Sequence, residues 1–204
     1  MDINCNCKCN VGDDEINLGC FNLIARRCEC GGTGGEPESL LISAEMTSDN
    51  EPYPFEASAS STVNVAGYSP SGAFRTGEAL ESVWASGSGT FSPSTGVGDA
   101  WCQIKIAKPE KLHRYTIRAW HNPGQGAGGF PRDWQVLGSN DGVDFTVVDT
   151  RVDQSVSGDS EIKEYILPVE PAEPFQYYRF HITKNNRKPE PYVVLRGVYL
   201  YKKA

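Results

Sequence analysis

Apolar and polar residues alternate with a period of two over much of the chain, which is the pattern of β-strands. The clearest case is PRDWQVLGSNDGVDFTVVDT, residues 131–150, in which two alternating segments flank Ser139-Asn140-Asp141-Gly142. Asn and Gly suit positive φ angles, and the Asp141 carboxylate can accept hydrogen bonds from the nearby backbone. The stretch therefore predicts a β-hairpin.

Other short β-type runs follow one another, and Gly, Pro, Asn or Asp separates most of them. No long stretch repeats apolar residues with the 3.6-residue period of a helix. Eight or nine strands of this kind predict an all-β sandwich or jelly roll. The runs are LLISAEM (40–46), STVNVAG (61–67), WCQIKIA (101–107), HRYTIRAW (113–120), DWQVLGS (133–139), FTVVDTRV (145–152), EIKEYILPV (161–169), QYYRFHITK (176–184) and YVVLRGVYLY (192–201).

Composition divides the chain near residue 31. Residues 1–30 hold six of the seven cysteines, and the flexible segment GGTGGEPE follows them. We predict a Cys-rich N-terminal attachment arm over residues 1–30, a Gly-rich linker over 31–38 and a β-domain over 39–204.

The arm cysteines are Cys5, Cys7, Cys9, Cys20, Cys28 and Cys30. In an extended strand the first three point the same way, about 6.6 Å apart at Cα. That spacing is near the upper limit for a disulfide, so they favour bonds to another segment or to a neighbouring subunit. Three alternatives stay open: disulfides, a thiolate zinc cluster without the usual two-residue gap, and reduced thiols. Cys102 lies on a core strand, and we predict a buried, inert thiol there.

Taken in order, several segments resemble the discoidin family, also called the coagulation factor 5/8 type C or galactose-binding-like fold. They are ASASS (57–61), GYSPSGAFRTG (67–77), Trp84, AWCQIKIAKPEKLHRYTIR (100–118), the hairpin, YYRFHITKNN (177–186) and VVLRGVYLY (193–201). The resemblance covers about residues 40–202 and implies a discoidin-like jelly-roll β-sandwich. It also implies a non-catalytic binding module for glycans, lipid head groups or proteins, with Trp84, Trp101 and Trp134 at core positions.

Members of the family often carry structural calcium, held by an early Asp-Gly loop and by a Glu in the last strand. At those places this sequence has Arg75 and Gly197. Calcium needs several hard oxygen ligands, so we expect no bound calcium and no other metal outside the arm.

A sugar presents an apolar C–H face and a rim of hydroxyls, so its site needs an exposed aromatic ring and fixed hydrogen-bonding groups. The candidates are Trp120, His121 and Asn122 in AWHNPGQGAGGFPR (119–132), Asn186 and Arg187 beside Asn185 in KNNRKPEP (184–191), and Tyr53 in EPYPFE (51–56). The alternatives are a core ring for Trp120, a turn residue for His121 and a solvated charge for Arg187. If Trp120 contacts the ligand, replacing it by Ala should abolish sugar binding with little change in Tm.

The net charge of −7 and the isoelectric point near 5.0 disfavour a nucleic-acid partner. No apolar run is long enough to cross a bilayer, and MDINCNCKCN lacks the features of a signal peptide, so we expect synthesis in a cytosol. The motifs G-x-S-x-G, H-E-x-x-H and a Gly-rich loop followed by Lys-Ser/Thr are missing, so we predict no enzyme.

The cytosol keeps thiols reduced, so disulfides are not expected in a chain made there. They could form if the chain assembles into a particle and is oxidised after the particle is released. We therefore predict a virion-associated structural or adhesion protein, as found among discoidin-like modules of tailed phages. The arm would attach a homo-oligomer to other virion or surface-structure proteins and display the domain toward a host-surface glycan. The alternatives are a free-standing bacterial lectin and a carbohydrate-binding module.

Overall fold

The computed structural model describes residues 9–11, 14–16, 37–42, 45–75, 83–120, 129–158, 160–186 and 191–204. The chain forms two compact units, Met1–Pro37 and Glu38–Ala204. In the first unit, β1 (Cys9–Val11) and β2 (Asp14–Ile16) pair antiparallel. The other five arm cysteines lie outside the described residues, so the roles of the arm and of the linker remain predictions.

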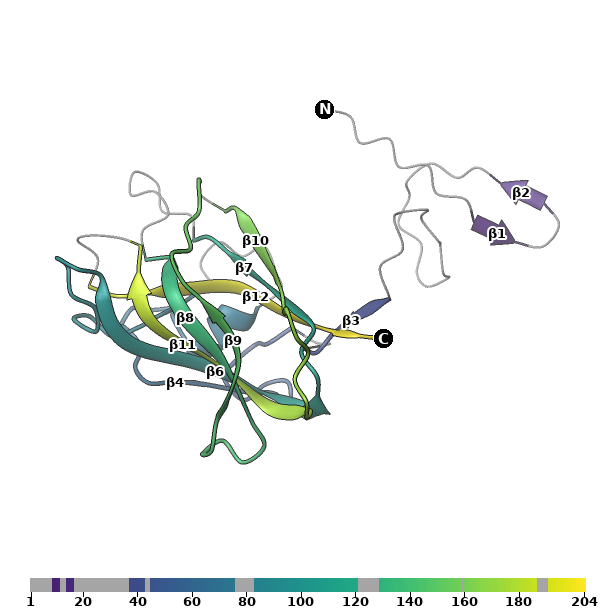
Figure 1. The fold of residues 1–204 in the computed structure, drawn as a ribbon, viewed down its shortest axis with the longest axis horizontal. Coiled ribbons are helices and arrows are strands. Elements are labelled where there is room, and N and C mark those ends of the chain that lie inside the picture. Colours follow the sequence, from purple (N-terminus) through teal and green to yellow (C-terminus); the bar gives the residue numbers. More distant parts are fainter. Residues whose placement is uncertain are drawn as a thin grey trace. The chain divides into compact units, whose positions relative to one another are not determined.

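The second unit contains two antiparallel sheets, and Figure 1 labels their strands except β5. One sheet has the order β10-β7-β12-β3, with β5 beside β12, and the other has the order β4-β6-β11-β8-β9. The predicted all-β sandwich is confirmed. Its elements are β3 (Glu38–Leu40), β4 (Glu56–Ala59), the 3-10 helix η1 (Pro70–Phe74), β5 (Trp84–Ala85), β6 (Val97–Glu110), β7 (Arg114–Arg118), β8 (Pro131–Ser139), β9 (Thr146–Arg151), β10 (Ile162–Ile166), β11 (Phe175–Asn185) and β12 (Val194–Lys203).

The predicted hairpin is formed by β8 and β9, which pair antiparallel. Gly142 adopts a φ of 75°, in the left-handed region that favours glycine. The Asp141 carboxylate accepts hydrogen bonds from the backbone N–H groups of Val143 at 2.8 Å and Asp144 at 2.9 Å. The loop is longer than expected, because β9 begins only at Thr146.

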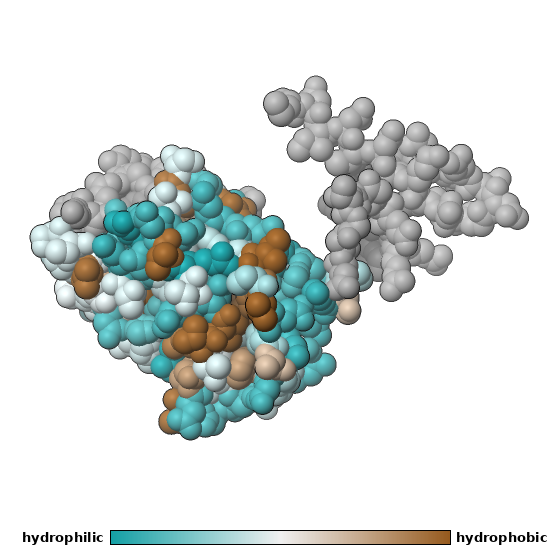
Figure 2. Space-filling model, viewed as in Figure 1, coloured by the Kyte–Doolittle hydropathy of each residue, from teal (hydrophilic) through white to brown (hydrophobic). Residues whose placement is uncertain are grey.

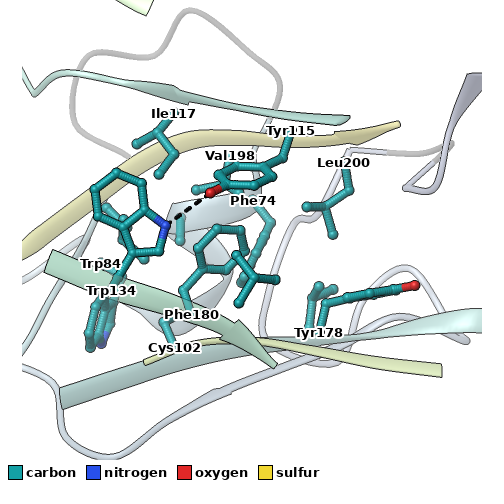
Figure 3. Packing of buried hydrophobic residues seen from close by; sticks show 14 of the residues in the cluster. Phe74, Trp84, Cys102, Tyr115, Ile117, Trp134, Tyr178, Phe180, Val198 and Leu200 are labelled. Carbon is teal, nitrogen blue, oxygen red and sulfur yellow. Dashed lines mark hydrogen bonds between the residues drawn. The ribbon is translucent and has the colours of Figure 1, made fainter. Parts of the chain in front are cut away.

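Large aromatic side chains fill the space between the sheets (Figure 3). The Trp134 Nε1–H donates to the Tyr115 hydroxyl at 3.1 Å, and that hydroxyl donates to the Asp149 carboxylate at 2.7 Å. These hydrogen bonds satisfy polar groups that would otherwise be costly to bury. Cys102 is buried as predicted, and burial raises the pKa of its thiol well above its usual range.

Some local predictions are wrong. The run 61–67 forms no strand, because its backbone turns: Val65 N–H donates to the Val63 carbonyl, and Tyr68 N–H donates to the Val65 carbonyl. The run 40–46 contributes only its first residue to β3. Trp84 and Trp134 are buried as predicted, but Trp101 is only half-buried. Its ring contacts the guanidinium of Arg179, a residue of β11 that pairs with Gln103 of β6. Trp101 shares the outer face of β6 with Gln103 and Lys105, which explains its position.

Several large hydrophobic residues of the second unit are exposed, among them Val143, Ile162 and Val169. On the face shown in Figure 2, hydrophobic patches are small and separated by hydrophilic side chains. Single exposed apolar residues are usual on protein surfaces, so this face gives no sign of a large apolar interface. Within the described residues, no helix has the length and hydrophobicity required to span a bilayer.

Candidate functional site

One end of the sandwich carries a small aromatic cluster. At this end, β7 ends beside the start of β12, and β11 ends beside the start of β8, because both pairs of strands are antiparallel. The rings of Tyr68 and Trp120 meet edge to face, with centroids 6.2 Å apart and an interplanar angle of 87°. We call the half-buried residues Tyr68, Trp120 and Tyr192, packed on Val83, Ala85 and Val194, the aromatic end cluster.

The backbone around the cluster is fixed by specific contacts. Val194 N–H donates to the Gly129 carbonyl at 2.8 Å. Gly129 has a φ of +81°, and a Cβ added there would lie 3.0 Å from Cγ2 of Val194. Burial raises the pKa of the Tyr68 phenol, so this group stays neutral and can donate a hydrogen bond. The cluster therefore offers aromatic carbon surface and a phenolic hydroxyl, and hydrogen bonds hold the backbone beside it in place.

The structure brings some of the predicted ligand residues together and separates others. Trp120 and Asn186 lie at the same end, since Asn186 bonds the backbone next to Gly129. The Asn186 amide donates to the carbonyls of Gln154 at 2.5 Å and Pro131 at 3.4 Å, so it holds the loop backbone. His121, Asn122 and Arg187 lie outside the described residues, and their roles remain predictions.

Tyr53 lies at the opposite end of the sandwich. It precedes β4, whose first residue Glu56 pairs with Lys105, whereas Ala59 pairs with Cys102 toward the Trp120 end. Its side chain is 83% exposed. Tyr53 is therefore not part of the aromatic end cluster.

Two members of the aromatic end cluster are not among the predicted ligand residues. Tyr68 stands in GYSPSGAFRTG, and Tyr192 stands next to KNNRKPEP. The available signal was an aromatic residue within a Pro- and Gly-rich loop. Their convergence with Trp120 depends on pairing between distant strands, which no local pattern reveals.

In the loop where the family resemblance implies calcium, the guanidinium of Arg75 takes a backbone carbonyl as its hydrogen-bond acceptor. The Arg75 guanidinium donates from Nη2 to the Thr47 carbonyl at 2.7 Å. A metal ion could not use this carbonyl without displacing the guanidinium. Gly197 has a φ of +53°, and a Cβ there would lie 3.0 Å from Cβ of Arg118. Among the residues that the structure describes, no group of three or more His, Cys, Asp or Glu side chains could hold a metal ion.

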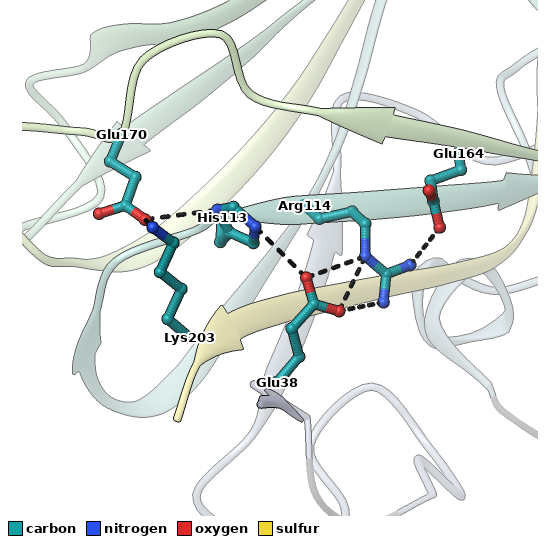
Figure 4. A network of polar contacts seen from close by, with 6 residues as sticks. All are labelled: Glu38, His113, Arg114, Glu164, Glu170 and Lys203. Atoms are coloured by element: carbon teal, nitrogen blue, oxygen red, sulfur yellow. Dashed lines mark hydrogen bonds and ion pairs between the residues drawn. The ribbon is translucent and has the colours of Figure 1, made fainter. Parts of the chain in front are cut away.

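Acidic side chains on and beside the sheet β10-β7-β12-β3 are engaged in a network of ion pairs (Figure 4). Arg114 donates to Glu38 from Nε at 2.9 Å and to Glu164 from Nη1 at 2.7 Å. The His113 ring lies between Glu38 and Glu170, 3.3 Å from each, and Lys203 lies 3.0 Å from Glu170. The network joins β3, β7, β10 and β12.

The pKa shifts of Glu38 and Glu170 in this network are opposite to those that a general acid needs. A hydrogen bond from Arg114 lowers the pKa of Glu38, and one from Lys203 lowers the pKa of Glu170. A carboxylic acid that donates protons near neutral pH needs a raised pKa. In the described part of the chain, every carboxyl group with a clear shift is lowered, namely Glu38, Glu110, Asp141, Glu161 and Glu170.

These features define a two-sheet β-sandwich with an aromatic, loop-lined end. The family model of the F5/8 type C domain matches residues 56–193, more than half of the chain. The chain belongs to the F5/8 type C domain family, and the discoidin-like resemblance is confirmed.

Solved structures of the same fold are similar to this chain. Chitosan-binding module 1 of a chitosanase/glucanase from Paenibacillus sp. IK-5 is 21% identical, with a TM-score of 0.53 over 80% of this chain and 99% of that one. The family 32 carbohydrate-binding module of NanJ from Clostridium perfringens, in complex with galactose, is 14% identical, with a TM-score of 0.52 over 72% and 93%.

The lectin binding domain of lectinolysin, in complex with Lewis b, is 16% identical, with a TM-score of 0.54 over 83% of this chain and 100% of that one. At these identities the similarity establishes the fold alone. The search of curated proteins found no match.

Proposed function

We propose that the second unit is a non-catalytic carbohydrate-binding domain whose ligand contacts the aromatic end cluster. The observation that carries this proposal is the half-buried Tyr68–Trp120 pair at the loop-lined end of the sandwich. Proteins of the same fold are named for binding chitosan, galactose and Lewis b, which supports a saccharide as the ligand.

The chemistry of the cluster suits a sugar. An aromatic face packs against the apolar C–H face of a pyranose ring, and fixed polar groups bond the hydroxyl rim. Tyr68 supplies a neutral phenol. His121 and Asn122 follow Trp120 in the sequence, and Arg187 follows Asn186, so these three residues stay predicted contacts.

A glycan array with the full chain tests the proposal, followed by calorimetry on the best ligand. Trp120→Ala should weaken binding at least tenfold, in the range of an interface residue that carries much of the affinity. Because Trp120 is half-buried against Val83, Ala85 and Val194, we also expect a loss of about 1–3 kcal/mol in stability. This revises the expectation of a nearly unchanged Tm.

The matched control is Tyr53→Ala, which removes an exposed aromatic ring at the opposite end and should leave affinity unchanged. If Trp120→Ala lowers Tm but keeps full affinity, the ring is only a packing residue and the proposed site is wrong.

A second proposal concerns the arm. The cysteine-rich segment and the glycine-rich joint after it support attachment and display of the domain, as on a virion or another surface structure. Several copies on one particle would raise the apparent affinity of a weak glycan site. Electrophoresis with and without reductant tests whether the arm cross-links chains.

A further inference from the structure

The outer face of the five-stranded sheet carries a second group of aromatic and charged side chains, away from the aromatic end cluster. Side chains alternate along a strand, so every second residue of β6 and β11 points outward. The register pairs Lys105 with Tyr177, Gln103 with Arg179, and Trp101 with His181. These three cross-strand pairs follow one another along β6 and β11, and together they form a row of outward-facing side chains.

The Arg179 guanidinium contacts two aromatic rings. Its guanidinium carbon lies 4.1 Å from the ring centroid of Trp101 and 3.8 Å from that of Phe145. Its Nε–H donates to Oε1 of Gln103 at 2.8 Å. Stacking between two rings and one fixed hydrogen bond restrict the side chain, so little conformational entropy is lost when a ligand binds it.

Two acidic side chains beside this row already have partners other than Arg179. Glu56 lies 2.7 Å from Lys105, and Asp99 lies 2.8 Å from His181. Within the described part of the chain, Arg179 forms no ion pair, and its two terminal nitrogens have no protein acceptor. Partial burial lowers its pKa, but a guanidinium remains charged at neutral pH. A partly desolvated charge without a counter-ion is stabilised by a bound anion.

We infer that Arg179, Trp101, Phe145 and Gln103 form a second saccharide site, which is selective for sugars that carry a carboxylate. The two terminal nitrogens present N–H groups in a planar fork, which matches the two oxygens of a carboxylate. The flanking rings offer surface for the sugar ring that bears this group. This site is separate from the aromatic end cluster, whose described residues are the aromatic side chains Tyr68, Trp120 and Tyr192.

The net charge of the protein limits the ligand. A chain with a charge of −7 repels long polyanions at a distance. At physiological salt this repulsion is screened beyond about 8 Å, so the attraction to Arg179 acts on contact. We therefore expect short uronate oligosaccharides to bind, and their neutral forms to bind much more weakly.

The test compares trigalacturonate with its fully methyl-esterified form on the full chain, by calorimetry at about 0.15 M salt. The two ligands differ in charge and hardly in shape. We expect the acid to bind at least tenfold more tightly than the ester. Arg179→Gln should remove this preference, and Arg179→Lys should restore only part of it, because lysine keeps the charge but lacks the planar fork.

Two controls isolate the site. Arg132→Gln removes a half-exposed arginine of the same sheet, paired with Asp153 at 2.5 Å, and should leave uronate binding unchanged. Trp120→Ala should also leave it unchanged, so failure at the aromatic end cluster and failure at Arg179 can be told apart. Should Arg179→Gln unfold, the Nε–H resonance of Arg179 in the wild-type chain provides a second measurement. It should shift with the acid and not with the ester.

Equal binding of the acid and the ester would overturn the inference, as would full uronate affinity in a folded Arg179→Gln variant. A sulfated trisaccharide that binds as tightly as the uronate would overturn the selectivity for carboxylate.

Discussion

Gly138, in β8, shows how one missing side chain shapes the core. A Cβ added there would lie 2.3 Å from Cδ2 of Phe175, well inside van der Waals contact. Phe175 is buried and meets Tyr178 edge to face. Gly138→Ala must therefore displace the Phe175 ring, and we expect a loss of about 1–3 kcal/mol in the free energy of unfolding. Urea denaturation measures it.

Gly158→Ala is the control for this substitution, because nothing lies within 4 Å of the position of its Cβ. Its stability should match the wild type or exceed it slightly, since alanine restricts the unfolded chain. Similar Tm values for the two variants would show that Phe175 moves aside at no cost.

Single residues also show what the sequence pattern could and could not reveal. The family resemblance predicts Trp101 in the core. However, Trp101, Gln103 and Lys105 lie two residues apart, so they share one face of the strand, and the polar side chains indicate that this is the outer face. The stack with Arg179 and Phe145 was not predictable in this way. It depends on the register between β6 and β11 and on the course of the hairpin loop, which bring distant parts of the chain together.

At the scale of elements, β3 is held to the sheet by its pairing with β12 and by the ion pairs of Glu38. The hydrogen bond from Arg114 is the main reason that the pKa of Glu38 is lowered in the folded protein. A lowered folded pKa stabilises the fold above the unfolded pKa, and this stabilisation is lost as the pH falls through the folded pKa. Acid should therefore release β3.

Urea midpoints at pH 7 and at pH 3 test this prediction. The midpoint should fall with pH in the wild type and fall less in Glu38→Gln, which cannot titrate at this position. Glu173→Gln, an exposed glutamate of the same unit, should behave as the wild type. An identical fall in Glu38→Gln would assign the acid sensitivity to other carboxylates, among them Glu170, whose pKa is also lowered.

Elements with local signals were predictable and those without them were not. The hairpin follows from Asp141 and Gly142, whose hydrogen bonds and positive φ are properties of a few neighbouring residues. Strand β4 has no such signal, because its register comes from pairing with Lys105–Cys102, far away in sequence. The run 61–67 has strand-like composition, but tertiary context turns it into a loop.

At the scale of the whole molecule, the fold followed from the sequence more readily than the site did. The order of strand-like runs is enough to indicate a sandwich, because each must bury one face. A binding site is assembled from several loops, and only Trp120 of the aromatic end cluster was among the predicted ligand residues. Loop residues come together through strand topology, so their chemistry in sequence does not reveal which of them meet.

The arm supplies the last prediction. If its six cysteines form disulfides between chains, the full chain should run as covalent oligomers on electrophoresis without reductant and as one band with it. Removing residues 1–37 should abolish the oligomers while leaving Tm nearly unchanged, because Glu38–Ala204 is a compact unit with its own core. A monomeric full chain whose arm thiols stay free in an oxidising buffer would contradict cross-linking. Bound zinc in that monomer, found by elemental analysis, would favour the thiolate cluster over attachment by disulfides.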